Sequence, residues 1–268
     1  MAVVKVQSVT GNGATIVLNG VAAGNALFLQ TGYYRAIATG VAEAVPTDSN
    51  GTFLVAQAPS PVNFGGVNDI GASIFSSVNV AAGTHTVTPQ ANTAHQQCLS
   101  EFSGLVTTTL LDVGANNSST VQHTSLATGT TGTTAQADEL VLIGHSMGAS
   151  AGSTDVGYTD PVSGFTTLFK QPDDATSVAV LQAYKVVASV GTQTATFNWT
   201  ASEVSMVSQA VIATFKAAAG GGPTRAPHLL LLGVGLVRCL AVLRLRESLS
   251  RRSLGKTLAA VCFPWRTP

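Results

Sequence analysis

Short runs of apolar and β-branched residues, separated by turn residues, recur along residues 3–217. Val, Ile, Thr, Phe and Tyr favour strands, whereas Gly, Asn, Asp and Pro favour turns. Turn signals return roughly every 8 to 12 residues, which is typical of antiparallel sandwiches and jelly rolls. The pattern therefore predicts an all-β fold with strands at 3–9, 14–18, 26–34, 52–57, 70–80, 84–88, 95–102, 119–128, 138–147, 165–170, 177–188, 192–199 and 205–216.

Some segments of this pattern support more specific predictions. An Asn-Gly pair lies in the turn 10–13 between the first two runs, which predicts a β-hairpin. In 205–216 the valines and Phe215 also fit helical spacing, so a strand and a helix both remain open. The segments 58–68 and 148–164 are rich in Gly, Pro, Ser and Asp and are predicted to be loops. No internal repeat of fixed period is visible.

Composition divides the chain into a β-domain at 1–217, a Gly-rich linker at 218–224 and a basic tail at 225–268. Residues 1–224 hold 5 Lys+Arg and 12 Asp+Glu, a balance of −7, and the tail holds 8 Lys+Arg and one Glu, a balance of +7. A mildly acidic body without a basic patch argues against a nucleic-acid partner. The net charge of zero therefore hides two opposite regions.

The tail is predicted to be helical or disordered, and three interpretations of it remain open. Its apolar run Leu229–Leu243 is shorter than the ~20 residues that cross a bilayer and contains Arg238, so it could form a membrane-surface or docking helix. It also resembles the C-terminal sorting anchors of Gram-negative envelope proteins, with Ala226-Pro227 in place of Pro-Glu-Pro. The third interpretation is a translated stretch that is not native to the domain. Membrane contact is predicted only through this tail, and no secretory signal peptide is visible at the N-terminus.

One stretch, Gly144-His145-Ser146-Met147-Gly148, resembles catalytic machinery. It matches the G-x-S-x-G elbow of lipases and esterases, in which the serine sits on a sharp turn between a strand and a helix. The apolar residues 140–143 lead into it as that motif requires. The resemblance implies Ser146 as the nucleophile, with its acid and base among Asp155, Asp160, Asp173, Asp174 and His228.

The surroundings of this motif favour a different interpretation. Residues 149–157 are rich in Gly, Ser and Thr and do not favour a helix, and the only histidine after Ser146 is His228 in the tail. Crossover helices between strands, which an α/β-hydrolase needs, are also missing from the pattern. We therefore expect an antiparallel strand, with His145 and Met147 on one face and Ser146 on the other. A serine esterase remains the alternative function.

The other polar and aromatic residues are assigned to the framework. The body histidines are not spaced as metal ligands and are predicted to be surface or half-buried, loop carboxylates are favoured over Ca²⁺ sites, and no cofactor or metal is expected. The aromatic side chains are predicted to pack in the core or at its rim, with stacking on sugars as the alternative. Cys98 is predicted to be a small buried hydrophobe. The residues concerned are His85, His95, His123, His145, Asp155, Asp160, Asp173, Asp174, Tyr33, Tyr34 and Trp199.

Four segments together resemble a group of uncharacterised bacterial and phage-associated β-sandwich proteins, over about residues 3–217. They are Val21-Ala22-Ala23-Gly24-Asn25, Leu99-Ser100-Glu101-Phe102-Ser103-Gly104, Ala137-Asp138-Glu139-Leu140-Val141 and Val211-Ile212-Ala213-Thr214-Phe215-Lys216. The resemblance implies an extracellular, cell-surface or virion module and brings no catalytic residues. The leading hypothesis is a non-enzymatic structural, adhesion or carbohydrate-binding module, with glycans or other surface proteins as partners.

Overall fold

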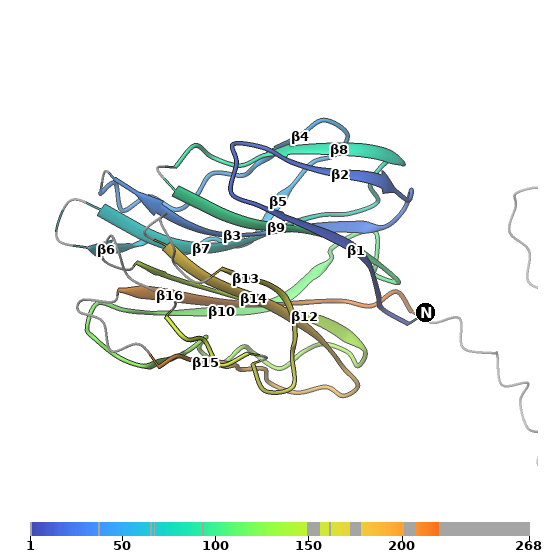
Figure 1. The fold of residues 1–268 in the computed structure, drawn as a ribbon. Coiled ribbons are helices and arrows are strands. Elements are labelled where there is room, and N and C mark those ends of the chain that lie inside the picture. Colours follow the sequence, from blue (N-terminus) through green and yellow to red (C-terminus); the bar gives the residue numbers. More distant parts are fainter. Residues whose placement is uncertain are drawn as a thin grey trace, which may run out of the picture. The chain divides into compact units, whose positions relative to one another are not determined.

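The structure, a computed structural model, describes residues 2–219 except 37, 65, 67, 93, 149–155, 161, 172–177 and 201–206. The predictions for Asp155, for Asp173 and Asp174 and for the tail at 225–268, including His228, therefore lie outside the described residues. The described residues form strands and no helix (Figure 1), which confirms the predicted all-β fold. The strands are β1 (Val4–Gly11), β2 (Ile16–Val21), β3 (Ala26–Arg35), β4 (Thr47–Asp48), β5 (Leu54–Gln57), β6 (Val62–Phe64), β7 (Asn68–Ser77), β8 (Gly83–Thr88), β9 (Ala94–Ser103), β10 (Leu111–Ser119), β11 (Ser125–Ala127), β12 (Glu139–Gly148), β13 (Thr166–Gln171), β14 (Val178–Val187), β15 (Thr196–Asn198) and β16 (Ser208–Phe215).

The strands lie in four layers, which can be followed from top to bottom in Figure 1. Two large sheets pack face to face in the middle, one with the order β1-β9-β3-β7-β5 and β6 beside β7, the other with the order β10-β16-β12-β14-β13. The small sheet β2-β8-β4 covers the outer face of the first, and the pair β11-β15 covers the outer face of the second. Every strand pair is antiparallel, as the short alternating runs predict.

Apolar side chains fill each of the three spaces between layers. Between the two large sheets, the Phe28 ring packs edge-on against Phe102 and Phe215, with ring centroids 5.6 and 4.6 Å apart. A second cluster around Phe75 lies under the first small sheet, and a third around Phe197 lies under the second. Because β12 and β14 lie in the middle of the second large sheet and are largely buried, their sequences are mostly apolar.

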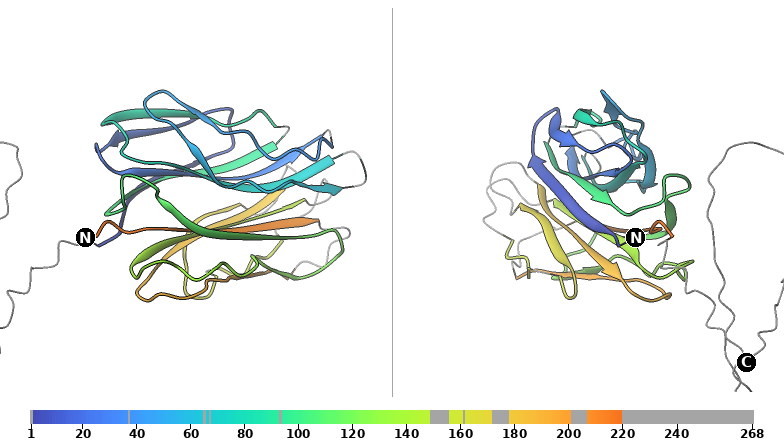
Figure 2. Two further views of the ribbon diagram at one scale, coloured as in Figure 1. Left: turned by 180° about the vertical axis from the view of Figure 1, so that it is seen from behind. Right: turned by 90° about the vertical axis from the view of Figure 1, so that its right-hand side faces the viewer.

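The two halves of the described chain have the same strand order. Replacing β1, β9, β3, β7 and β5 by β10, β16, β12, β14 and β13 converts the first large sheet into the second. The same replacement converts the pair β2-β8 into β11-β15. In each half the first and last strands are neighbours, which is the wrapping of a jelly roll. The chain is thus two jelly rolls in tandem, packed through their larger sheets (Figure 2).

Residue registers and irregularities agree between the halves as well. Leu29 pairs with Phe75 and Leu99, and in the second half Ile143 pairs with Ala183 and Ile212. A register shift in β5 falls opposite Phe75, and the shift in β13 falls opposite the equivalent Ala183. The sequence offset changes from 114 residues (29 to 143) to 108 (75 to 183) and 113 (99 to 212). Loop lengths therefore remove any fixed period, although the fold repeats.

The packing between the large sheets is symmetric with respect to this repeat. Strand β3 faces β12, its own equivalent in the other half. Strand β7 faces β12 and β16, and its equivalent β14 faces β3 and β9, the equivalents of those two strands. A contact pattern that maps onto itself when the halves are exchanged is that of an isologous, twofold interface. Here that interface lies within one chain.

The structure corrects several predicted elements. The predicted hairpin is wrong because β1 pairs with β9 and β2 with β8, so the Asn12-Gly13 turn carries the chain from one sheet to another. The segment 205–216 contains a strand, β16, and the segment 58–68 contains the short strand β6. Strand β10 was not predicted, since its residues 111–119 are rich in Asn, Ser and Gly.

Candidate functional site

The predicted nucleophile Ser146 lies within the central antiparallel strand β12. Both edges of β12 are paired at this residue, because Ser146 lies opposite Val180 on β14 and opposite Gln209 on β16. The side chain is fully buried between the large sheets and lies against Gly32 of β3. The strand continues through Met147 to Gly148, so the sharp turn of an elbow is absent at this serine.

Among the predicted partners of Ser146, the structure describes only Asp160. His145 lies on the opposite face of β12, and Asp160 is an exposed residue whose carboxylate accepts a hydrogen bond from the Thr167 hydroxyl. Asp155 and His228 lie outside the described residues. A buried serine cannot transfer a proton to an imidazole on the other face of its strand, so His145 is not placed to act as a base for Ser146.

The histidines are more buried than the sequence predicts. His85, His95 and His145 are buried, and His123 is half-buried. The His145 ring stacks between Phe197 and Trp199 with centroids 4.9 and 5.0 Å away, and burial lowers the pKa of His145 to about 3. Among the described residues no group of three His, Cys, Asp or Glu side chains is placed to hold a metal ion.

Predictions for the aromatic residues and the cysteine can be checked in the same way. Tyr33 and Trp199 are buried, so they pack in the core and offer no open stacking face, whereas Tyr34 is half-buried. Cys98 is fully buried, as predicted, and burial raises the pKa of its thiol to about 12. The thiol is therefore protonated and unreactive at neutral pH.

A group of buried polar residues, which we call the polar cluster, lies in the first jelly roll. The register of β3, β7 and β9 places its side chains on the face that is turned towards the small sheet. They continue the rows that begin with Leu29, Phe75 and Leu99, but at one end of the sandwich the apolar residues give way to polar ones. The polar cluster consists of Thr31, Tyr33, Arg35, Glu43, Asp69, Ser73, His95 and Gln97.

Arg35 and Asp69 form one part of the polar cluster. The guanidinium lies 3.5 Å from the carboxylate, and Arg35 Nε also donates to the Asn92 side chain at 3.1 Å. Asp69 Oδ2 accepts hydrogen bonds from the Thr39 N–H and hydroxyl and from the Gly40 N–H. These bonds hold the segment 38–46 against Arg35 of β3 and Asp69 of β7.

Glu43, in the same segment, contacts Thr31 of β3 and His95 of β9. One carboxylate oxygen accepts a 2.5 Å hydrogen bond from the Thr31 hydroxyl. The other lies 3.1 Å from His95 Nε2 but without the angles of a hydrogen bond. Burial raises the pKa of the nearby Tyr33 hydroxyl, and the Glu43 charge raises it further. The segment is thus held mainly by buried side chains.

Several polar atoms in and beside the cluster have no partner within the part of the chain that the structure describes. A buried polar atom without a hydrogen bond costs about 1–3 kcal/mol, so native proteins contain few of them. Both donors and acceptors occur in this set. They include Arg35 Nη2, Asn92 Nδ2, Ser73 Oγ, Asp69 Oδ1 and Gln97 Oε1.

The second jelly roll provides an internal comparison for the polar cluster. Across β7, β3 and β9, the register aligns Ser73, Thr31 and Gln97 in one row of residues and Gly71, Tyr33 and His95 in the next. Both rows have direct equivalents in β14, β12 and β16. There most side chains are apolar and belong to the core under the second small sheet. The equivalent residues are His145, Leu181, Ala210, Met147, Ala179 and Ser208.

Two surface pockets adjoin the polar cluster. The first, of about 590 Å³, is lined by Arg35, Thr39, Val41, Gln90 and Asn92 together with two alanines. The second, of about 210 Å³, lies beside it, since both are lined by the loop 90–92, and it is also lined by His95. A volume of roughly 300–1,000 Å³ is typical of ligand pockets, so the first pocket is large enough for a small ligand.

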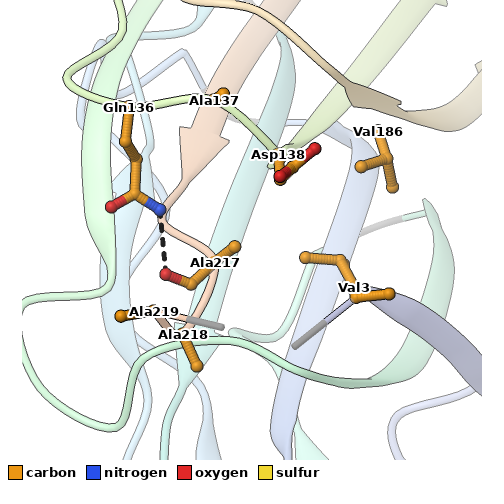
Figure 3. Close-up of a pocket in the computed structure, with 9 residues that line it drawn as sticks. Val3, Gln136, Ala137, Asp138, Val186, Ala217, Ala218 and Ala219 are labelled. Carbon is orange, nitrogen blue, oxygen red and sulfur yellow. Dashed lines mark hydrogen bonds between the residues drawn. The ribbon is translucent and has the colours of Figure 1, made fainter. Parts of the chain in front are cut away.

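A further pocket, of about 500 Å³, lies near the N-terminus and is shown in Figure 3. Its wall consists mainly of alanine and valine side chains, including Val3 and Val186. The Gln136 side chain is already used, because its Nε2 donates to the Ala217 carbonyl at 2.8 Å. With few polar groups left to orient a ligand, this pocket is the weaker candidate for a binding site.

The sequence singled out His95 and Tyr33 but missed Arg35, Glu43 and Asp69. A usable signal was present, because the first 224 residues contain only 5 Lys+Arg, and Arg35 directly follows the predicted strand 26–34. A charged residue at the end of a buried strand is seldom left unpaired. Its partner Asp69 is 34 residues away, and only the register of β3 and β7 joins them.

Comparisons with known proteins leave the chain without an assigned family. No protein-family model, no curated protein and no solved structure matches it. Within the described part of the chain, no helix of the length and apolarity needed to cross a bilayer is present.

Proposed function

We propose that this chain is a non-enzymatic β-sandwich module that binds carbohydrate in the pocket over the polar cluster. The support is the contrast between the two jelly rolls. At the two rows that can be compared, the second half carries mostly apolar side chains, whereas the first half carries the buried polar residues Thr31, Tyr33, Ser73, His95 and Gln97. The fold can therefore be built without those groups, and their desolvation cost calls for another role.

The pocket has the chemistry that a sugar requires. Its polar wall comes from the planar side chains of Arg35, Gln90 and Asn92, and its apolar wall from Val41 and neighbouring alanines. Sugars present hydroxyl groups at their edges and C–H groups on their faces, so mixed walls of this kind suit them. Arg35 and Asn92 are oriented before a ligand arrives, because they hydrogen-bond to each other.

A surface location agrees with this proposal. The body carries few charges, 5 Lys+Arg and 12 Asp+Glu in its first 224 residues, and is rich in hydroxyl side chains. The resemblance to bacterial and phage-associated β-sandwich proteins suggests a cell-surface or virion location. We propose that the module acts there in adhesion, and labelling of intact cells or particles with an antibody to the β-domain would test it.

A glycan array with the purified chain tests the binding function. Wild type is expected to bind a subset of glycans, and Asn92→Ala is expected to lose most of that signal because the variant lacks one polar side chain of the pocket wall and the hydrogen bond that orients Arg35. Asn198→Ala is the matched control, since Asn198 lines a separate pocket in the second jelly roll. Failure of wild type to bind any glycan, or equal loss in both variants, would contradict the proposal.

A further inference from the structure

We infer that the site selects neutral saccharides over acidic ones, an inference that rests on the proposed carbohydrate-binding function. Arg35 is the only cation that lines the pocket in the described part of the chain. Its charge is already compensated, since the Asp69 carboxylate lies 3.5 Å from the guanidinium and is fully buried. The pocket therefore offers no unbalanced positive charge to a carboxylate ligand.

A second carboxylate strengthens this selection. Glu43 is buried in the same cluster and faces Thr31 and His95. At neutral pH the group Arg35, Asp69 and Glu43 carries one positive and two negative charges. A ligand carboxylate would enter a region that holds more carboxylate than guanidinium groups, and would lose its hydration there.

The unpaired atoms match hydroxyl groups better than they match an ion. Arg35 Nη2 and Asn92 Nδ2 are buried donors on two residues that line the pocket, Asp69 Oδ1 is a buried acceptor on the partner of Arg35, and none of the three has a hydrogen-bond partner among the described residues. A hydroxyl both donates and accepts, so neighbouring hydroxyls of a neutral sugar can satisfy donors and acceptors together. A carboxylate only accepts and would leave Asp69 Oδ1 without a donor.

Calorimetric titration with matched ligands tests this selection. The probes are the methyl glycosides of glucose, galactose and mannose and the corresponding uronic acids at equal ionic strength. We expect the preferred neutral glycoside to bind at least about tenfold more tightly than its uronic acid. Asn92→Ala is expected to weaken neutral binding roughly tenfold, with Asn198→Ala unchanged.

A charge variant identifies the cause. Asp69→Asn keeps the shape of the side chain but removes the carboxylate that lies 3.5 Å from the Arg35 guanidinium, so we expect uronic acid binding to rise about tenfold or more. Asp48→Asn, a buried carboxylate paired with His85 in the same jelly roll, is the control and should change neither affinity. Far-UV circular dichroism and the unfolding temperature of each variant show whether it has folded.

The outcomes separate the two proposals. Tighter binding of a uronic acid by wild type overturns the selection for neutral sugars and leaves carbohydrate binding in place. Unchanged uronic acid affinity in folded Asp69→Asn also overturns the charge argument. Absence of binding to both ligand series and to the glycan array overturns the proposed function itself.

Discussion

At the scale of single residues, His145 shows how burial determines protonation. The ring lies between Phe197 and Trp199, and its Nδ1 is 2.8 Å from the Tyr158 hydroxyl, so a charge there would lack solvent. Burial lowers the pKa of His145 to about 3, from 6.5 in the unfolded chain. The folded state therefore binds fewer protons than the unfolded state between these two values.

A pH dependence follows from His145. Its contribution to stability is complete above pH 6.5 and is lost as the pH falls towards 3. At about pH 4 the loss amounts to roughly 2–3 kcal/mol. Urea unfolding of wild type and His145→Phe at about pH 4 and about pH 7 measures it, and the variant should lose less stability in acid. An equal acid loss in both proteins would contradict the assignment.

For Ser146 we predict a variant that does not lose stability. The Ser146 hydroxyl is buried without a hydrogen-bond partner among the described residues. Ser146→Ala removes an unpaired polar atom, so we expect unchanged or higher stability, within about 1 kcal/mol of wild type. Thermal unfolding measures this. Wild type and variant should also show the same background rate on a p-nitrophenyl ester, and a rate that falls in the variant would restore Ser146 as a nucleophile.

At the scale of elements, close contact between the central strands β3 and β12 depends on a glycine. A Cβ added at Gly32 would lie 2.2 Å from Val180 Cγ1 and 3.2 Å from Ser146 Cβ. Gly32→Ala is therefore expected to lower the free energy of unfolding by about 1–3 kcal/mol. Chemical denaturation measures the loss, with Gly191→Ala, where a Cβ meets nothing within 4 Å, as the control.

The Gly32 prediction has an internal check. Adding Val180→Ala to Gly32→Ala removes the clashing methyl groups and should recover part of the loss, because neighbouring residues couple. If the double variant is no more stable than the sum of the single effects, the clash is not the cause. Gly71, which lies under the Tyr33 ring, marks a similar close approach within the first large sheet.

Periodicity predicts strands well in this chain but predicts their partners poorly. The run at 138–147 and strand β12 agree within a residue because the apolar residues, turn signals and burial coincide. The hairpin at 10–13 failed because jelly-roll wrapping sends consecutive strands to different sheets, and local turn chemistry does not encode that choice. Strand β10 was missed because its Asn and Ser residues face solvent at a sheet edge.

The polar cluster was beyond prediction for a related reason. Thr31, Ser73 and Gln97 are ordinary strand residues in the sequence, and only the pairing of β3 with β7 and β9 makes them neighbours. For the elbow motif, the antiparallel strand that we expected is confirmed. Five residues matched a catalytic string, but the antiparallel pairing of β12 with β14 and β16 places the serine inside the core.

At the scale of the whole molecule, one apolar layer joins the two jelly rolls. Phe28 and Phe102 from the first half and Leu140 and Phe215 from the second lie in one buried cluster. Opening either half would expose this layer, so we expect the β-domain to unfold in a single transition. Scanning calorimetry tests this, since equal calorimetric and van't Hoff enthalpies indicate two-state unfolding. A chain that ends at Gly222 should unfold at the same temperature, because it retains the whole compact unit Met1–Gly222.

The isologous contact between the large sheets has a consequence for valency. A dimer of identical subunits packed in this way would carry every surface site twice. Two jelly rolls joined in one chain can differ in sequence, so one half can keep a site that the other half lacks. The polar rows around Thr31 and His95 and their mostly apolar equivalents in β12, β14 and β16 are such a divided pair. Each chain would then present one binding site, and strong attachment to a multivalent surface would require several chains to be displayed together.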